Sequence, residues 1–317
     1  MTNPRNIILT FPRRFIAGII ARMERLGPID NPKASWAESV ESYGSVPDYF
    51  KGFFEPYRTG GLEFPYAVLT PNFEGFIHPT MEKLICDMGR EICVLERNGN
   101  SFIAKCYPLE GISYVEMRSI LLDSHIKISG VIGDGISTSS TLRFNTVSDA
   151  RFTPLLNKIR RTSVGSAGAA RNSESEIFNS WRDLDFKFMN FARRSLMGEE
   201  EVIQAILQPE IRERVISVLG MTWYRRISPT LASILTDREL ILIREEEKQV
   251  ASERYGGIWD YIPLNKIQKM SLIPRDVNAL VLSIQLPHND HLDCVFQFSA
   301  KREVDQLIDR FQELTAA

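Results

Sequence analysis

The sequence predicts a mainly β protein with a smaller share of α-helix (an α+β fold), built from two copies of one unit. Three observations predict this. Short apolar stretches alternate with polar residues at strand spacing, a strand pattern recurs along the chain, and each copy ends in an amphipathic helix. The length of 317 residues suits about two domains. We therefore divide the chain into residues 1–63, 64–161, 162–198 and 199–317.

Residues 1–63 are expected to hold an amphipathic helix and an irregular connection. Over 11–26, apolar residues recur at helical spacing on one side and arginines lie on the other. The Pro-, Gly- and aromatic-rich stretch 27–63 predicts an ordered but irregular connection. The helix either docks on the first domain, which the sequence favours, or lies on an anionic membrane surface. Its candidate membrane or partner contacts are Arg13, Arg14, Phe15, Ile19, Arg22 and Arg25.

Residues 64–161 alternate between short strands and turns, and then form a helix. The clearest signal is Asn98-Gly99-Asn100 between two apolar runs, which predicts a hairpin. A helix is expected over 149–161. The small, polar stretch 162–174 predicts a flexible linker, and apolar residues at helical spacing predict one connecting helix over 175–195.

The pattern returns to strands after 199. A short helix is expected first, and then strands from 215 to 298, of which Val215–Tyr224 is the first. In 280–286, apolar residues alternate with Ser283 and Gln285, as in a strand with one buried face. A closing helix is expected over about 300–315.

An internal repeat links the two parts of the chain. The stretch from Gly89 resembles the stretch from Asp237, and both parts end in a helix with apolar residues at i, i+3, i+4 and i+7. The aligned pairs are Arg90 with Arg238, Ile92 with Leu240, Tyr107 with Tyr255, Tyr114 with Tyr261, and Ile120 with Ile267.

The second copy resembles the bacterial pleckstrin-homology-like (PH-like) domains. The resemblance rests on a threonine followed by Asp237-Arg238, the apolar run Leu240–Ile243, Ile262-Pro263-Leu264, Ile267 and the closing helix. It covers about 200–315 directly and 64–161 through the repeat. It implies two tandem PH-like domains, each a bent sheet or barrel closed by a C-terminal amphipathic helix. It also implies a role in binding rather than catalysis.

The cysteines and apolar runs bear on localisation. Cys86, Cys93, Cys106 and Cys294 are expected to be buried thiols of a reducing compartment, because none forms a C-x-x-C pair. No apolar run approaches the roughly 20 residues of a membrane-spanning helix. The stretch after Arg13-Arg14 is too short and charged for an export signal. We expect a cytoplasmic protein, with a position at the inner membrane surface as the alternative.

Two motifs resemble chemical sites. His288, Asp290, His291, Asp293 and Cys294 could bind a metal, but Asn and Asp after Pro287 favour a hairpin turn. The stretch 130–137 imitates a phosphate loop, yet lacks its lysine and favours a hairpin loop. No hydrolase, zincin or kinase motif set occurs in the sequence. We therefore expect no catalytic residues, no cofactor and no metal.

The charge balance and the repeat set the functional expectation. A net charge of −2 gives no general attraction to nucleic acid, so we do not expect nucleic acid as a partner despite basic doublets such as Arg225-Arg226. The primary hypothesis is a non-catalytic binding or scaffold protein that engages a protein partner. The membrane surface is one place where this binding would occur. The alternatives are a peripheral membrane protein anchored by helix 11–26 and a metal-dependent enzyme centred on 288–294.

Overall fold

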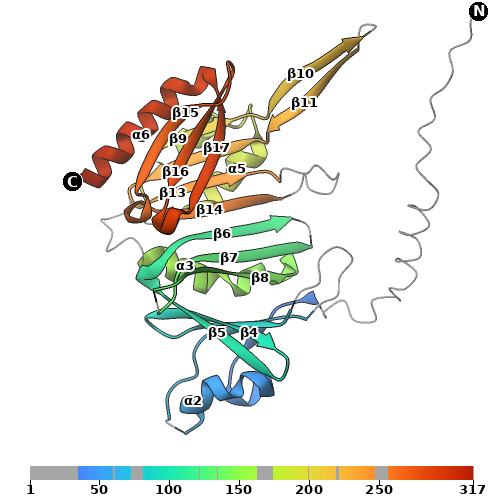
Figure 1. Ribbon diagram of the computed structural model, residues 1–317, viewed down its shortest axis with the longest axis vertical. Coiled ribbons are helices and arrows are strands. Elements are labelled where there is room, and N and C mark those ends of the chain that lie inside the picture. Colours follow the sequence, from blue (N-terminus) through green and yellow to red (C-terminus); the bar gives the residue numbers. More distant parts are fainter. Residues whose placement is uncertain are drawn as a thin grey trace, which may run out of the picture.

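The computed structural model of the protein describes residues 35–59, 61–72, 81–120, 122–133, 135–162, 174–198, 200–218, 221–246 and 256–316 (Figure 1). The predicted helix 11–26 and residues 163–173 of the predicted linker lie outside the described residues. We call the described residues up to 162 the first half and those from 174 the second half. The first half contains the strands β1 (Glu38–Val40), β2 (Ala67–Thr70), β3 (Lys83–Asp87), β4 (Glu91–Asn98), β5 (Ser101–Pro108), β6 (Ile112–Ile120), β7 (Asp123–Val131) and β8 (Ser137–Phe144), and the helices α2 (Glu55–Thr59) and α3 (Thr153–Thr162).

The second half contains more strands and a longer closing helix. Its strands are β9 (Val202–Gln208), β10 (Ile211–Val218), β11 (Met221–Ser228), β12 (Leu231–Thr236), β13 (Glu239–Arg244), β14 (Gly257–Pro263), β15 (Lys269–Pro274), β16 (Ala279–Gln285) and β17 (His291–Gln297). Its helices are α4 (Glu174–Asn179), α5 (Phe186–Ser195) and α6 (Lys301–Ala316).

The described strands form antiparallel sheets. Their orders are β1-β2-β3-β4-β5, β8-β7-β6-β14-β13-β12-β9, β15-β16-β17 and the isolated pair β10-β11. The protein is therefore mainly β with a smaller share of helix, as the sequence predicts. Among the described strands no sheet closes into a barrel, so of the two forms predicted, bent sheet and barrel, the structure has open sheets.

The two halves repeat one order of elements. In each, a strand ends at a proline, a 3-10 turn follows, a three-stranded antiparallel meander comes next, and a helix closes the unit. Pro108 precedes the turn in the first half and Pro263 precedes it in the second, with nearly the same backbone angles. The meanders are β6-β7-β8 and β15-β16-β17, and the closing helices are α3 and α6.

One backbone hydrogen bond recurs and fixes the register of the repeat. The Leu109 N–H donates to the Arg90 carbonyl at 3.0 Å, and the Leu264 N–H donates to the Arg238 carbonyl at 2.9 Å. This equivalence supports the predicted match of Arg90 with Arg238. Such a bond holds the start of each 3-10 turn against the residue that precedes the neighbouring strand.

The later matches of the predicted repeat are wrong in register. Tyr114 lies on β6, after the turn, whereas Tyr261 lies on β14, before it. Tyr107 stands next to Pro108 as Ile262 stands next to Pro263, so Tyr107 matches Ile262, and its predicted match Tyr255 lies outside the described residues. The predicted pair of Ile120 and Ile267 is likewise displaced, because Ile120 ends β6 and Ile267 only caps the 3-10 turn. The register slipped because 12 residues separate β13 from β14 but only 2 separate β4 from β5, and side-chain similarity alone does not place that insertion.

The two halves share one continuous sheet. Strand β6 of the first half pairs with β14 of the second, from Val115 opposite Tyr261 to Ser119 opposite Gly257. The seven-stranded sheet therefore runs across both halves (Figure 1). Backbone hydrogen bonds, as well as side-chain packing, hold the halves together.

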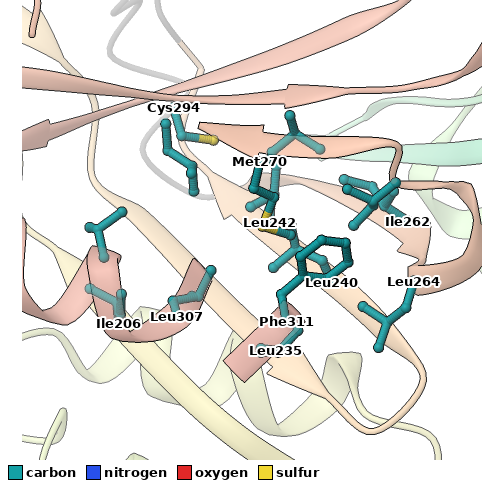
Figure 2. Close-up of a cluster of buried hydrophobic side chains, with 14 of the residues drawn as sticks. Ile206, Leu235, Leu240, Leu242, Ile262, Leu264, Met270, Cys294, Leu307 and Phe311 are labelled. Atoms are coloured by element: carbon teal, nitrogen blue, oxygen red, sulfur yellow. The ribbon is translucent and has the colours of Figure 1, made fainter. Parts of the chain in front are cut away.

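Strand alternation places separate cores on the two faces of the second-half sheet. Leu240 and Leu242 of β13 point into a core closed by β15–β17 and α6 (Figure 2). Ile241 and Ile243 point to the other face, where α4 and α5 cover them. Both faces are buried, which is why β12 and β13 read as continuous apolar runs.

The strands β2–β4 of the sheet β1–β5 are also buried on both faces over most of their length. One face packs against β6–β8 and α3, through residues such as Ile92 and Tyr107. The other face lies under aromatic residues of 43–64, including Phe50 and Phe54, which are fully buried. Residues 27–63 were expected to be irregular. Their described part instead supplies the edge strand β1, two 3-10 stretches and α2.

The structure corrects two predicted helices. The single helix predicted over 175–195 is two, α4 and α5, because residues 180–185 form a turn and Asp185 caps α5 by accepting a hydrogen bond from the Phe188 N–H at 3.1 Å. The short helix expected after 199 is strand β9, which pairs with β12. The break between α4 and α5 is a local turn and cap, whereas at β9 tertiary pairing overrides a weak local pattern.

Candidate functional site

The β10–β11 hairpin projects from the body of the protein (Figure 1). The two strands form a sheet of their own and join no other sheet of the described chain. The single strand predicted for Val215–Tyr224 is therefore wrong, since the chain reverses between Val218 and Met221. The signal that could have shown this is Gly220, the one glycine in an otherwise apolar run.

The hairpin exposes large apolar side chains. Val215 is 54% exposed, Trp223 is 51% exposed and Tyr224 is 60% exposed. A two-stranded hairpin has no core of its own, so its side chains are free to meet a partner.

The two faces of the hairpin differ in charge. One face carries Arg212 opposite Arg226 and Arg214 opposite Tyr224. On the other face the Arg225 Nη2 contacts the Glu213 Oε2 at 3.0 Å, and both side chains are exposed. Trp223 falls on this second face, because successive strand residues alternate. Arg212 on the first face contacts Glu210 and Arg226 contacts Glu245, so the hairpin combines mostly paired arginines with exposed aromatic side chains.

The root of the hairpin is fixed by ion pairs. The Arg226 Nη2 contacts the Glu245 Oε2 at 3.2 Å, and its Nη1 donates to the Glu246 carbonyl at 3.2 Å. Lys187 of α5 pairs with the same Glu245. Because these partners come from α5 and from the residues that follow β13, the end of β11 nearest the body is held in place.

A pocket of about 400 Å³ opens beside this root. Arg226, Arg244 and Arg275 contribute to its wall, together with Asp293 and the buried Cys294. The remaining lining residues are Ile227, Ser228, Pro229, Leu231 and Val295. Two of the three arginines already have acidic partners, because Arg226 pairs with Glu245 and Arg244 with Glu116. The pocket therefore carries little free positive charge.

A cluster of charged side chains spans the junction of the halves. The Glu116 carboxylate on β6 contacts His125 Nε2 at 2.8 Å and Arg244 Nη2 at 2.8 Å. Arg244 Nη2 also lies 3.3 Å from the Asp260 Oδ2. Burial raises the pKa of Asp260 to about 7, with Glu116 adding to the rise against the opposing effect of Arg244. These contacts tie β6, β7, β13 and β14 together.

A second buried cluster joins α3 to the second half. The Arg160 Nε lies 3.0 Å from the Glu239 Oε1, and its guanidinium lies 4.0 Å above the Tyr261 ring. Arg160 Nη2 donates to the Ser195 carbonyl at 2.8 Å. Burial, together with the nearby Glu239, raises the pKa of Glu200 to about 9. Glu200 therefore keeps its proton at neutral pH, and Glu239 is the acidic side chain that pairs with the Arg160 guanidinium.

The predicted contact residues of the N-terminal helix cannot be placed on the fold. Arg13, Arg14, Phe15, Ile19, Arg22 and Arg25 all lie outside the described residues. Within the described part of the chain, no helix is long and apolar enough to cross a membrane.

The segment 288–294 forms a turn, as the sequence favours. A 3-10 turn spans Pro287–Asn289, with His288 and Asn289 at positive φ, and β17 begins at His291. Cys294 points into the core while Asp293 faces outward, so strand alternation separates these two ligand types. The stretch 130–137 likewise connects β7 and β8 as a hairpin loop.

The expectation of four reduced cysteines is wrong for two of them. Cys93 and Cys106 form a disulfide between β4 and β5. Cys86 and Cys294 are free and buried, as predicted. Sequence spacing missed the bond because the cysteines are 13 residues apart and meet only through the register of the hairpin.

No protein-family model and no curated protein matches the chain.

Proposed function

We propose that this protein is a non-catalytic binding or scaffold protein that works at an anionic membrane surface and holds its partner there. The observation that carries the proposal is the projecting β10–β11 hairpin with its exposed Trp223 and Tyr224. Aromatic rings of this kind favour the interface between water and lipid, and arginines beside them favour anionic headgroups.

The repeated architecture supports a PH-like reading of both halves. Each half places an antiparallel sheet against a three-stranded meander and ends in one amphipathic helix, in the order that the resemblance implies. The proposal does not place the ligand in the pocket at the root, because its arginines Arg226 and Arg244 already have acidic partners. Arg212 and Arg225 of the hairpin are paired as well, with Glu210 and Glu213, so the exposed Trp223 and Tyr224, rather than free charge, favour the hairpin over the pocket. The proposed location is the cytoplasmic face of a membrane.

A protein partner is the second candidate. The outer edges of β10 and β11 pair with no described strand, and such edges accept an added strand from another chain. In that case affinity comes from backbone hydrogen bonds and from Trp223 as an anchor.

Vesicle flotation with the full chain tests the proposal. We expect the wild type to float with anionic vesicles and not with neutral ones, and the double variant W223S/Y224S to stay at the bottom of the gradient. The matched control is Ile19→Asp in the segment 11–26, which should float like the wild type.

The other outcomes favour the alternatives. If Ile19→Asp abolishes flotation and the hairpin variant floats, residues 11–26 are the anchor. If the wild type fails to float at all, the membrane proposal is wrong. The hairpin is then better explained as a binding site for a protein partner.

A further inference from the structure

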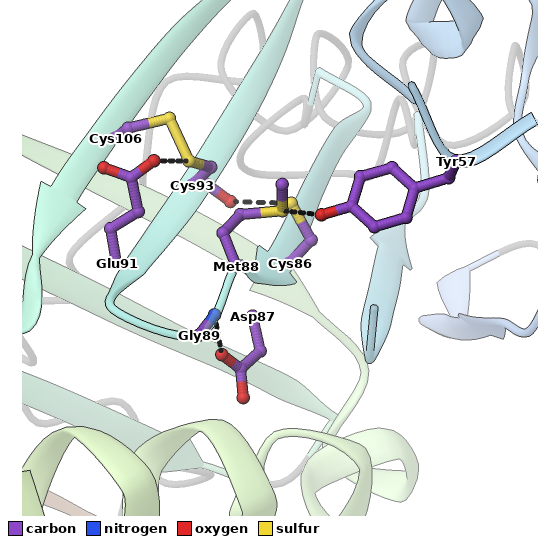
Figure 3. Close-up of a disulfide and its surroundings, with 8 residues drawn as sticks. All are labelled: Tyr57, Cys86, Asp87, Met88, Gly89, Glu91, Cys93 and Cys106. Atoms are coloured by element: carbon purple, nitrogen blue, oxygen red, sulfur yellow. Dashed lines mark hydrogen bonds between the residues drawn. A yellow bond between two sulfur atoms is a disulfide. The ribbon is translucent and has the colours of Figure 1, made fainter. Parts of the chain in front are cut away.

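Three cysteines stand in register across neighbouring strands. Cys86 of β3 lies directly opposite Cys93 of β4, and Cys93 lies directly opposite Cys106 of β5. Their side chains therefore share one face of the sheet. Figure 3 shows the Cys93–Cys106 disulfide with Glu91 beside it and Cys86 on the neighbouring strand.

Glu91 completes a set of metal-ligating atoms around the disulfide. It stands two residues before Cys93 on β4, which places it on the same face. Within the described part of the chain, the ligand atoms of Glu91, Cys93 and Cys106 all lie within 4.8 Å of one another. Two of these side chains, Glu91 and Cys106, are half-buried and reachable from solvent, while Cys93 is fully buried.

The spacing of the carboxylate and the sulfur suits tetrahedral zinc. The Cys93 Sγ and the Glu91 Oε1 are 3.6 Å apart. Zinc binds thiolate sulfur at about 2.3 Å and carboxylate oxygen at about 2.0 Å, so two such ligands at a tetrahedral angle lie about 3.5 Å apart. The Cys93 sulfur and the Glu91 oxygen are therefore already at about the distance expected of two ligands of one zinc ion.

We propose that Cys93 and Cys106, once reduced, form a zinc site together with Glu91. The zinc site and the disulfide use the same two sulfur atoms, so only one of them can exist at a time. A thiol or phosphine reductant supplies two electrons, the S–S bond breaks, and two protons from water give two thiols. Zinc then replaces both thiol protons and forms two Zn–S bonds, and the Glu91 carboxylate supplies a Zn–O bond. Water fills the fourth position, as in other sites with three protein ligands.

The zinc site rests on the proposed cytoplasmic location, where a disulfide between Cys93 and Cys106 is unexpected. Disulfides rarely persist where glutathione keeps thiols reduced, and cysteines there more often bind metals. A site that exchanges a disulfide for zinc removes the conflict and makes this face of the first half sensitive to redox state and to zinc supply. Cys86 is not assigned as a ligand, because its thiol donates to the Cys93 carbonyl at 3.6 Å and it lies outside the group of ligand atoms formed by Glu91, Cys93 and Cys106.

Zinc titration of the reduced, untagged full chain against a chromophoric chelator tests the proposal. We expect one Zn²⁺ per reduced chain and none per oxidised chain. Cys106→Ser and Glu91→Gln should each weaken binding at least about tenfold, since even loss of an outer-shell partner costs that much. Cd²⁺ in place of Zn²⁺ should give a thiolate-to-metal absorption band in the reduced wild type.

Matched variants identify the ligands. Cys294→Ser and Cys86→Ser should bind zinc like the wild type, and circular dichroism should show each variant folded. If Cys106→Ser does not fold, Glu91→Gln decides, because its side chain is half-buried. The proposal is overturned if the reduced wild type takes up no zinc. It is also overturned if Glu91→Gln binds unchanged, or if Cys86→Ser or Cys294→Ser abolishes binding.

Discussion

Asp260 of β14 lies directly opposite Glu116 of β6, so the strand pair that joins the two halves brings two carboxyl groups onto one face. Arg244 Nη2 contacts both, at 3.3 Å and 2.8 Å. Three charged groups therefore share a junction in which Asp260 is almost fully buried. The charge at this junction depends on the protonation of Asp260.

The first prediction concerns Asp260 and pH. Burial raises the pKa of Asp260 from its ordinary 3.8 to about 7, so the folded state keeps a proton that the unfolded state has lost. The free energy of unfolding should therefore fall as pH rises from about 4 to about 7. Asp260→Asn should flatten this slope and, at pH 8, stabilise the protein by at least about 1 kcal/mol.

Urea unfolding at several pH values checks this prediction. Glu116 does not contribute to the change in unfolding free energy between about pH 4.5 and 7. Contacts with His125 and Arg244 lower its pKa to about 2 against the opposing effect of burial, so its stabilising contribution is lost only as pH falls from about 4.5 toward 2. An Asp260→Asn variant with the wild-type slope between pH 4 and 7 would contradict the assignment.

The second prediction separates two buried carboxyls around Arg160. Burial and Glu239 raise the pKa of Glu200 to about 9, so Glu200→Gln should change stability at pH 7 by less than about 1 kcal/mol. Glu239→Gln should cost about 1.5 kcal/mol or more, since it removes the carboxylate bonded to Arg160 and leaves Glu200, 3.6 Å from Arg160 Nη2, as the remaining acidic partner. Thermal unfolding at pH 7 compares the two, and equal losses would show that the roles are misassigned.

The third prediction concerns the close backbone approach at Gly256. A Cβ at this position would lie 2.2 Å from the Ser119 carbonyl oxygen and 2.6 Å from the Ile120 Cα, at the seam between β14 and β6. Gly256→Ala should destabilise the protein by about 2 kcal/mol or more. The matched control is Gly133→Ala, which meets no atom within 4 Å and should unfold at the wild-type urea concentration. A stable Gly256→Ala variant would argue against the shared sheet.

The fourth prediction uses tryptophan fluorescence to follow the hairpin. Trp223 is 51% exposed, whereas Trp181 is 5% exposed. Anionic vesicles should move the emission of the wild type to shorter wavelength, because lipid replaces water around Trp223. Trp223→Phe should remove the shift, and neutral vesicles should cause none. A shift that survives in Trp223→Phe would place the contact elsewhere.

Local pattern was enough to predict several elements of the fold. The alternation of Leu280, Leu282 and Ile284 with polar residues predicted β16, and the apolar stripe of the last helix predicted α6. In both elements only one face is strongly apolar and buried. Apolar residues therefore recur along the sequence with the period of a strand or of a helix. The hairpin β4–β5 was predicted for a similar reason, because Asn-Gly favours the turn that joins its strands.

The candidate sites were mostly not predicted. The residues selected in 11–26 lie outside the described chain, whereas the exposed Trp223 and Tyr224 were read as part of one strand. An apolar run that is buried and one that projects into solvent look alike in a sequence. Only Gly220 marks the reversal, and one glycine does not distinguish a bulge from a turn.

The sequence by itself determined the hairpin β4–β5, the strand β16, the closing helices and the match of Arg90 with Arg238, because each depends on neighbours within a few residues or on a copied segment. Tertiary structure alone decided that β6 pairs with β14, that Cys93 meets Cys106, and that the hairpin stands away from the body. The physical reason is register. Strands far apart in sequence pair through backbone groups that all residues share, so no local pattern records which strands meet.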